Sequence, residues 1–312
     1  MSQIFGPVPS RRLGFSLGID PIPFKTCSLD CIYCQLGRTT HKTVKRKEYV
    51  SSNQILKELE EFLKEKKKID YITFSGSGEP TLNSNIGKMI TQIKKITSIP
   101  IAVLTNGTLL YHPQVREDLL EADLVIPSLD AVSEKIFKEV NRPHTSLKID
   151  KVISGIIKFS KEFKGKIWLE IMLVKGVNDS LKEIEKEAQI TKEMKLNKIQ
   201  LNTVIRPPAE NFAQALDIKD LEKRRKIFGK DKCEIIAKFK ERRQKAYKKD
   251  IEKEILRTLK RRPLTIEDLS SFLGLHRNEI IKYIAVLEGE GEVKSKFNNG
   301  QRYYEKIFEK KV

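Results

Sequence analysis

Residues 25–37 read KTCSLDCIYCQLG, and they hold Cys27, Cys31 and Cys34, three of the four cysteines of the chain. Thiols this close together in a reduced compartment usually hold a metal or take part in redox chemistry. A structural zinc site needs four ligands, and this segment offers three. An iron–sulfur cube held by three thiolates fits the spacing better, because its fourth iron stays open for another ligand. The remaining cysteine, Cys233, is distant in sequence, and we expect it to hold no iron.

Around this segment, short runs rich in Ile, Val and Leu alternate with amphipathic stretches. Such runs are typical of strands that are covered on both faces. The predicted strands are 15–19, 69–74, 101–104, 123–126, 167–174 and 199–204, and the clearest predicted helices are 54–66, 86–96, 147–163 and 181–194. Repeated β-α units predict a parallel sheet with crossover helices. The fold class is therefore α/β, a partial (β/α)6 barrel whose chemistry lies at the C-terminal ends of its strands.

The pattern changes after residue 206. Residues 232–249 are rich in lysine and arginine and predict a basic helical connector, with Cys233 inside it. Three helices are expected at 251–259, 264–274 and 276–287, followed by a hairpin whose turn is Asn298-Asn299-Gly300. This order is typical of a winged helix-turn-helix. The predicted domains are a barrel at 1–225, the connector at 226–250 and the winged helix at 251–312.

Polar motifs follow the predicted strands. FSGSGEPT stands at 74–81, LTNG at 104–107 and SLD at 128–130. With C-x3-C-x2-C and Tyr33 before the last cysteine, they resemble the radical S-adenosylmethionine superfamily. FGPVPSRRLG at 5–14 and GIDP at 18–21 resemble its wyosine-base-forming, tRNA-modifying members. The resemblance covers residues 5 to about 206. Those members hold a second cluster on further cysteines, and this chain has only Cys233 to spare, so we do not expect the same reaction.

The resemblance implies a [4Fe-4S] cluster on Cys27, Cys31 and Cys34 whose open iron binds S-adenosylmethionine. Reduction through the cluster would break a carbon–sulfur bond, and the resulting radical would remove hydrogen from a substrate. The turn at 75–79 would hold the methionyl amino group, with Ser77 in place of a glycine. The implied cofactor contacts are Tyr33, Gly76, Ser77, Gly78, Glu79, Asn106, Ser128 and Asp130. Glu170 and Asn202, polar residues within barrel strands, are added to this set, and no catalytic residue is assigned.

The formal net charge of +18 favours a polyanionic partner. Arginines suited to an anionic substrate are Arg11, Arg12, Arg142 and Arg206, with ordinary ion pairing as the alternative. Basic or polar residues suited to phosphate contacts are Arg277, Asn278 and Lys282 on the third C-terminal helix, and Lys294, Lys296 and Arg302 on the hairpin. The expected function is a radical enzyme acting on tRNA or other RNA. The alternatives are an enzyme that modifies a protein or peptide, and a non-enzymatic iron–sulfur DNA-binding regulator.

The remaining expectations concern surroundings and organisation. The first residues show no charged-then-apolar signal pattern and the apolar runs are short, so we expect a cytoplasmic protein without a membrane partner. We expect an electron donor such as ferredoxin or flavodoxin. If residues 251–312 are only a docking module, their deletion should leave uncoupled cleavage of S-adenosylmethionine nearly intact.

Overall fold

The computed structural model describes residues 2–10, 12–206, 208–236, 249–260, 262–298 and 301–307. Within these ranges the main sheet has eight strands in the order β1-β2-β5-β6-β7-β8-β9-β10. β1 pairs antiparallel with β2, and each later neighbouring pair is parallel. The strands are β1 (Ile4–Ser10), β2 (Gly14–Ile19), β5 (Tyr71–Phe74), β6 (Ile101–Thr105), β7 (Leu124–Pro127), β8 (Lys166–Leu173), β9 (Lys198–Thr203) and β10 (Cys233–Ile235). The expected α/β partial barrel is confirmed.

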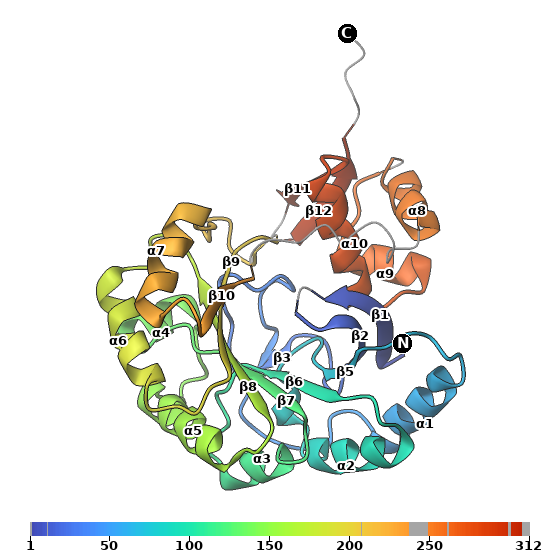
Figure 1. Ribbon diagram of the computed structural model, residues 1–312. Coiled ribbons are helices and arrows are strands. Elements are labelled where there is room, and N and C mark those ends of the chain that lie inside the picture. The colour runs from blue at the N-terminus through green and yellow to red at the C-terminus, as the bar shows by residue number, and fades with distance from the viewer. Residues whose placement is uncertain are drawn as a thin grey trace.

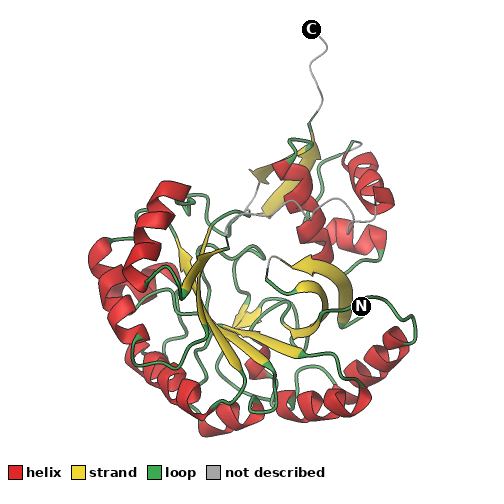
Figure 2. Ribbon diagram, in the orientation of Figure 1, coloured by secondary structure: helices red, strands yellow, loops and turns green. Residues whose placement is uncertain are grey.

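Helices cover the outer, convex side of this curved sheet (Figures 1 and 2). They are α1 (Ser52–Leu63), α2 (Ile86–Ile96), α3 (Pro113–Asp118), α4 (Glu134–Val140), α5 (Ile149–Glu162), α6 (Leu181–Thr191) and α7 (Ile218–Phe228). The loop after β2 carries a small ribbon of β3 (Thr26–Cys27) and β4 (His41–Lys42), and a 3-10 turn, η1 (Pro80–Leu82), follows β5. Among the described helices, none is both long and apolar enough to cross a membrane.

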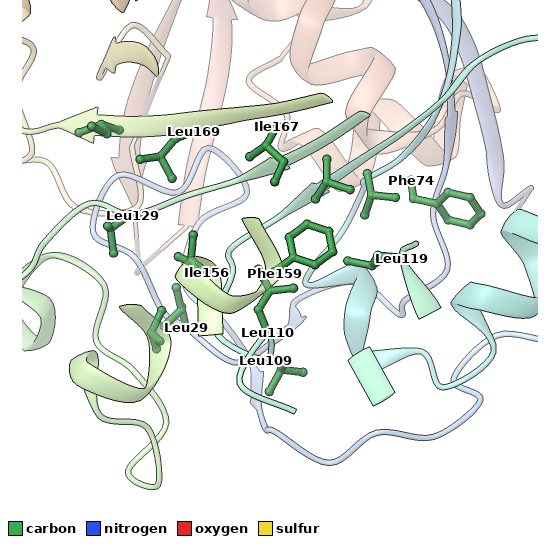
Figure 3. Close-up of a cluster of buried hydrophobic side chains, with 14 of the residues drawn as sticks. Leu29, Phe74, Leu109, Leu110, Leu119, Leu129, Ile156, Phe159, Ile167 and Leu169 are labelled. Atoms are coloured by element: carbon green, nitrogen blue, oxygen red, sulfur yellow. The ribbon is translucent and has the colours of Figure 1, made fainter. Parts of the chain in front are cut away.

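The main core lies between the sheet and these helices. Figure 3 shows Ile156 and Phe159 of α5 beside Ile167 and Leu169 of β8. All four are buried, and burial of each such side chain contributes about 1.5–3 kcal/mol. A second cluster, built on Leu13, Ala102, Leu124 and Ile126, packs with Trp168. Ala102 and Leu124 stand near the starts of their strands, whereas Ile126 stands near the end of β7.

Two strands of the sheet were not expected. β10 begins at Cys233, so the interpretation that placed this cysteine in a basic helix is wrong. Cys233 is buried in the main core, and β10 extends the parallel sheet beside β9. β1 contains two prolines and still forms an antiparallel edge strand, where proline is tolerated. Of the predicted connector, residues 237–248 lie outside the described residues.

The C-terminal unit has its own core. Its elements are α8 (Lys249–Leu259), α9 (Ile266–Leu273), α10 (Arg277–Gly289), β11 (Val293–Asn298) and β12 (Gln301–Lys306). Thr265 and Asp268 form a capping box at the start of α9, and Gly274 ends it in the left-handed conformation. The expected order of three helices and a hairpin is present. The identification of this unit as a winged helix stays a prediction.

This unit packs on the barrel. α10 lies against β1 (Figure 1), where the His276 ring stacks on Phe5 at 4.5 Å between centroids. Arg302 of β12 donates a hydrogen bond of 2.7 Å to the carbonyl of Pro208, in the segment after β9. Leu36 of the cysteine loop is partly buried and packs against the core of the C-terminal unit. The unit therefore contacts both ends of the open barrel.

Candidate active site

A cavity of about 370 Å³ opens at the C-terminal ends of the barrel strands. This volume is within the usual range of small-ligand pockets. Of the residues expected to contact a cofactor, it is lined by Tyr33, Gly76, Gly78, Glu79, Asn106, Ser128, Glu170 and Asn202, together with Cys27 and Cys34. Side chains from the cysteine loop and from five strands or strand ends thus converge on one space.

The three clustered cysteines are free thiols, and each has a nitrogen donor beside its sulfur. Asn106 Nδ2 lies 3.5 Å from Cys27 Sγ and Asn141 Nδ2 lies 3.3 Å from Cys31 Sγ. Lys25 Nζ lies 4.0 Å from Cys34 Sγ. Burial raises the pKa of Cys27 to about 12 and also raises the pKa of Cys31. Donors of this kind stabilise charge on a thiolate sulfur.

Among the described residues, no group of three or more Cys, His, Asp or Glu side chains is arranged to hold a single metal ion. A cube of four irons separates its ligand sulfurs further than one ion does. Three thiol ligands with three nitrogen donors around them fit such a cluster by donor type and by number.

The turn after β5 is shaped by close contacts of its glycines. Gly76 has a φ of +131°, and a Cβ on Gly78 would lie 1.8 Å from the carbonyl oxygen of Thr26. Ser77, between them, donates its backbone N–H to Asp20 Oδ1 at 3.0 Å and its hydroxyl to Asp20 Oδ2. Ser77 therefore faces Asp20, and it does not line the cavity.

Glu79 ends this turn with its carboxylate fully engaged. The Oε1 atom accepts hydrogen bonds of 2.6 Å from both the Thr81 and Thr105 hydroxyls, and Oε2 accepts one of 2.7 Å from the backbone N–H of Asn106. Burial raises the pKa of Glu79, and these bonds oppose that rise. Glu79 consequently ties the turn to the next strand end, β6.

Asp130 is buried and does not line the cavity, although its partner Tyr33 does. It accepts hydrogen bonds from the Tyr33 hydroxyl, from Asn141 Nδ2 at 2.7 Å and from the backbone N–H of Met172 at 3.0 Å. Burial raises its pKa to about 6, against the effect of the Tyr33 and Asn141 bonds. The structure thus gives Asp130 a place supporting Tyr33 and the cysteine loop, whereas the resemblance implied that it faces the cofactor.

The cavity is also lined by an ion pair to which an asparagine is bonded. Arg12 NH1 pairs with Glu170 Oε2 at 2.8 Å, and Asn202 Nδ2 donates to Glu170 Oε1 at 2.9 Å. Arg206 also lines the cavity and donates to Gln35. Arg142 pairs with Glu210 at 2.6 Å and does not line the cavity. Arg11 lies outside the described residues.

The structure places the C-terminal residues expected to bind phosphate in different surroundings: some line the cavity, and others are engaged elsewhere. Asn278 and Lys282 line the cavity. Arg277 stacks on the Phe24 ring at 4.2 Å. Lys294 and Lys296 both pair with Glu305, at 3.4 and 2.7 Å.

Sequence reasoning missed Lys25, Asn141, Asp20 and His276. His276 Nε2 lies 3.1 Å from Asp20 Oδ2 although the two residues are 256 positions apart. No local pattern marks such pairs, because each depends on the packing of distant segments. Two of the four carried a sequence signal: Lys25 lies two positions before the first clustered cysteine, and Asp20 stands in the GIDP motif at 18–21.

Comparison with known proteins agrees with this geometry. A family model described as the radical SAM superfamily matches residues 22–188. UPF0026 protein MJ1312 of Methanocaldococcus jannaschii is 39% identical over 312 residues, covering 98% of this chain and 96% of that protein. The protein named GTPase Obg of Brachyspira hyodysenteriae is 41% identical over 305 residues, which are 97% of this chain. The chain spans only 45% of that relative's length.

Solved structures share the fold at low identity. The structure of TYW1 with a lysine-pyruvate adduct bound has a TM-score of 0.54 at 16% identity, covering 73% of this chain and 76% of that chain. A radical SAM methyltransferase from Sphaerobacter thermophilus has a TM-score of 0.55 at 16% identity, covering 70% and 65%. Members of the matched superfamily use a [4Fe-4S] cluster and S-adenosylmethionine. The chain therefore belongs to the radical SAM superfamily, in which it groups with the UPF0026 proteins, and it is a radical SAM enzyme.

Proposed function

We propose that Cys27, Cys31 and Cys34 hold the [4Fe-4S] cluster and that the cavity binds S-adenosylmethionine beside it. The observation that carries this proposal is the convergence of Cys27, Cys34 and most of the expected contact residues on one cavity. Cys233 packs in the main core at the start of β10, distant from these thiols in sequence, and serves as a core residue. When bound, the cluster and S-adenosylmethionine supply reductive carbon–sulfur cleavage and a radical that takes hydrogen from the substrate.

The chain's own residues orient these groups. The turn at residues 75–79 is held by Asp20 and by the close approach of Gly78 to Thr26, so its backbone is fixed before any ligand binds. Glu79 fixes the position of Asn106 through the backbone N–H of that residue. A preorganised backbone favours this chemistry, because the bound groups are oriented without further rearrangement of the turn.

For the substrate we propose RNA, including tRNA. Support comes from the formal net charge of +18 and from three cationic side chains at the cavity, Arg12, Arg206 and Lys282. Cations placed beside a reaction site suit a phosphate-bearing substrate. An electron donor of the ferredoxin or flavodoxin type would supply the reducing electron.

Two measurements test this function. Anaerobically reconstituted protein with dithionite should produce 5′-deoxyadenosine from S-adenosylmethionine, and the Cys27→Ala variant should not. Mass spectrometry of RNA nucleosides from cells with and without the gene should then reveal a nucleoside that disappears with the gene and returns with the wild-type copy only. Absence of 5′-deoxyadenosine would overturn the enzymatic proposal. A gene-dependent change in a peptide, with all nucleosides unchanged, would replace RNA by protein as the substrate.

A further inference from the structure

Helix α10 supplies one wall of the cavity. Asn278, in its first turn, and Lys282, one turn later, both line this space. Residues four positions apart on a helix project from the same face, so the two side chains act on one region of the cavity. Phe5 and Ser10 of β1 and Leu36 of the cysteine loop also line the cavity, and none of them is among the expected cofactor contacts.

Asn278 has an unsatisfied amide. The residue is 6% exposed, and its Nδ2 atom is buried with no hydrogen-bond partner among the described residues. A buried N–H group left without a partner costs about 1–3 kcal/mol. A ligand oxygen within the cavity would remove that cost.

The position of α10 is fixed by contacts of its N-terminal residues. The His276 side chain caps the helix through the N–H of Asn278, stacks on Phe5 and reaches Asp20. Arg277 stacks on Phe24. These contacts anchor the amide of Asn278 to the barrel, so the wall is built before the substrate binds.

The charges around this wall favour an oxyanion. Lys282 and Arg206 bring positive charge to the cavity, Arg12 offsets the charge of Glu170, and the carboxylate of Glu79 is engaged by hydroxyl and N–H donors. An amide N–H and an ammonium group on one helix face can both donate to the same oxyanion.

We propose that Asn278 and Lys282 form a phosphate-binding subsite on the wall that the C-terminal unit contributes, and that it positions a phosphate of the substrate beside the cofactor. The identity of that phosphate as part of RNA rests on the proposed function. The subsite itself rests on the buried amide and its cationic neighbour. The C-terminal unit is then part of the active site and not only a docking module.

The test measures binding without turnover. Reconstituted full-length protein is saturated with S-adenosylhomocysteine, and inorganic phosphate is titrated and followed by ³¹P NMR. Asn278→Asp, which keeps the side-chain shape but adds a repelling charge, and Lys282→Met should each weaken phosphate binding by about 10- to 100-fold, the loss of one charge-assisted hydrogen bond. Asn278→Ala serves as a second variant, and Lys296→Ala, on the hairpin and outside the cavity, should bind as wild type does.

Each other outcome overturns the proposal. Equal phosphate affinity in all variants, or no saturable binding to the wild type, removes the subsite. Binding of acetate in place of phosphate makes it a carboxylate site. Weaker binding of S-adenosylhomocysteine in the Asn278 variants assigns the amide to the cofactor. Because no turnover is needed, a failure to form 5′-deoxyadenosine affects the proposed function alone.

Discussion

At the scale of single residues, the cluster loop differs from Cys233 in its surroundings. The clustered thiols have nitrogen donors from Asn106, Asn141 and Lys25, whereas Cys233 is a buried core residue at the start of β10. Hydrogen bonds to ligand sulfurs are a protein's means of tuning an iron–sulfur cluster. Cys233, with Leu201 and Arg225 beside it, is a single thiol, and only the first group brings three thiols together in one loop.

Cys27→Ala should lose nearly all cluster iron, because a cube held by two thiolates is not retained. Cys233→Ala should keep the iron content of the wild type and lose only stability, since removing a buried side chain leaves a cavity. Iron and sulfide are counted after anaerobic reconstitution and gel filtration. Equal iron loss in both variants would contradict the assignment of the ligands.

Glu187 of α6 is a buried carboxyl that the site does not use. It is 1% exposed, its Oε1 atom has no hydrogen-bond partner among the described residues, and burial, followed by the charges of Asp130 and Glu183, raises its pKa well above the usual value. At pH values between the unfolded and the folded pKa, the folded state therefore keeps a proton on Glu187 that the unfolded state has released. Stability contributed by this group is present below the unfolded pKa and is lost as pH rises toward the folded pKa.

Glu187→Gln should remove this pH dependence. In the wild type, Glu187 lowers the free energy of unfolding by about 1.4 kcal/mol per pH unit between the two pKa values. The variant's advantage over the wild type should grow on going from pH 5 to pH 7, as measured by urea unfolding. Glu185→Gln, an exposed neighbour on the same helix, is the matched control. A constant difference at both pH values would refute the prediction.

The sequence patterns predicted the residues that line the cavity better than the residues that hold the surrounding turns in place. Gly76, Gly78, Glu79 and Asn106 stand directly after strands, so their place at the cavity followed from the topology. Ser77 and Asp130 occupy the same kind of position, yet hydrogen bonds to Asp20 and Tyr33 turn them away from the cavity. Those partners are fixed by tertiary packing, which no local pattern records.

At the scale of elements, the turn after β5 depends on two glycines, because a Cβ atom at either position would meet neighbouring atoms. The space at Gly78 is taken by backbone of β3, and the space at Gly76 by the Asp20 side chain. Backbone cannot move aside as a flexible side chain can. The Gly78 position is therefore the more restrictive of the two.

Gly78→Ala should force β3, and with it Cys27, away from the turn. Overpacking of this kind costs about 1–3 kcal/mol, and S-adenosylhomocysteine should bind at least about tenfold more weakly because the turn is displaced. Thermal unfolding and equilibrium binding provide the measurements. Gly289→Ala, at the end of α10 with open space around its Cβ position, should leave binding unchanged. Wild-type binding by Gly78→Ala would show that the turn does not hold the cofactor.

Among the strands of the main sheet, those predicted correctly are stretches of four or more residues rich in Ile, Val and Leu. β10 is short, Cys233–Ile235, and follows a lysine-rich stretch, so its pattern is too brief to separate from a helix. β1 contains Pro7 and Pro9, which lower strand propensity everywhere except at an edge. The two strands that the sequence did not predict, β1 and β10, lie at the edges of the main sheet, where a strand pairs with only one neighbour.

At the scale of the whole molecule, the C-terminal unit reaches the cofactor side of the barrel through one chain of contacts. His276 bonds to Asp20, and Asp20 holds Ser77 of the turn. The expectation that residues 251–312 are separable from cleavage did not include this link. Their deletion would leave Asp20 without His276 and expose Phe5.

Deletion of residues 251–312 should therefore lower S-adenosylhomocysteine affinity as well as substrate modification, in contrast to the expectation from sequence. His276→Phe breaks the link, because a phenyl ring retains stacking on Phe5 but cannot bond to Asp20; it also removes the side-chain cap of α10, so thermal unfolding is measured alongside binding. We expect it to weaken S-adenosylhomocysteine binding by about three- to tenfold, the loss of one hydrogen bond of about 1 kcal/mol. Wild-type affinity in both proteins would restore the view of a separable module.

Salt dependence tests the remaining question of the partner. Several basic residues of the C-terminal unit are already engaged: Lys294 and Lys296 pair with Glu305, and Arg302 bonds to Pro208.

If RNA binding still involves about four to six phosphates, the log–log slope of affinity against salt should be near −4 to −5. Lys282→Met should make that slope shallower by about 1, because its ammonium group contacts one phosphate. Lys64→Ala, which removes an exposed lysine of the barrel surface paired with Glu61, should not change the slope. Bulk tRNA is the probe, and a flat slope for the wild type would instead favour a peptide substrate.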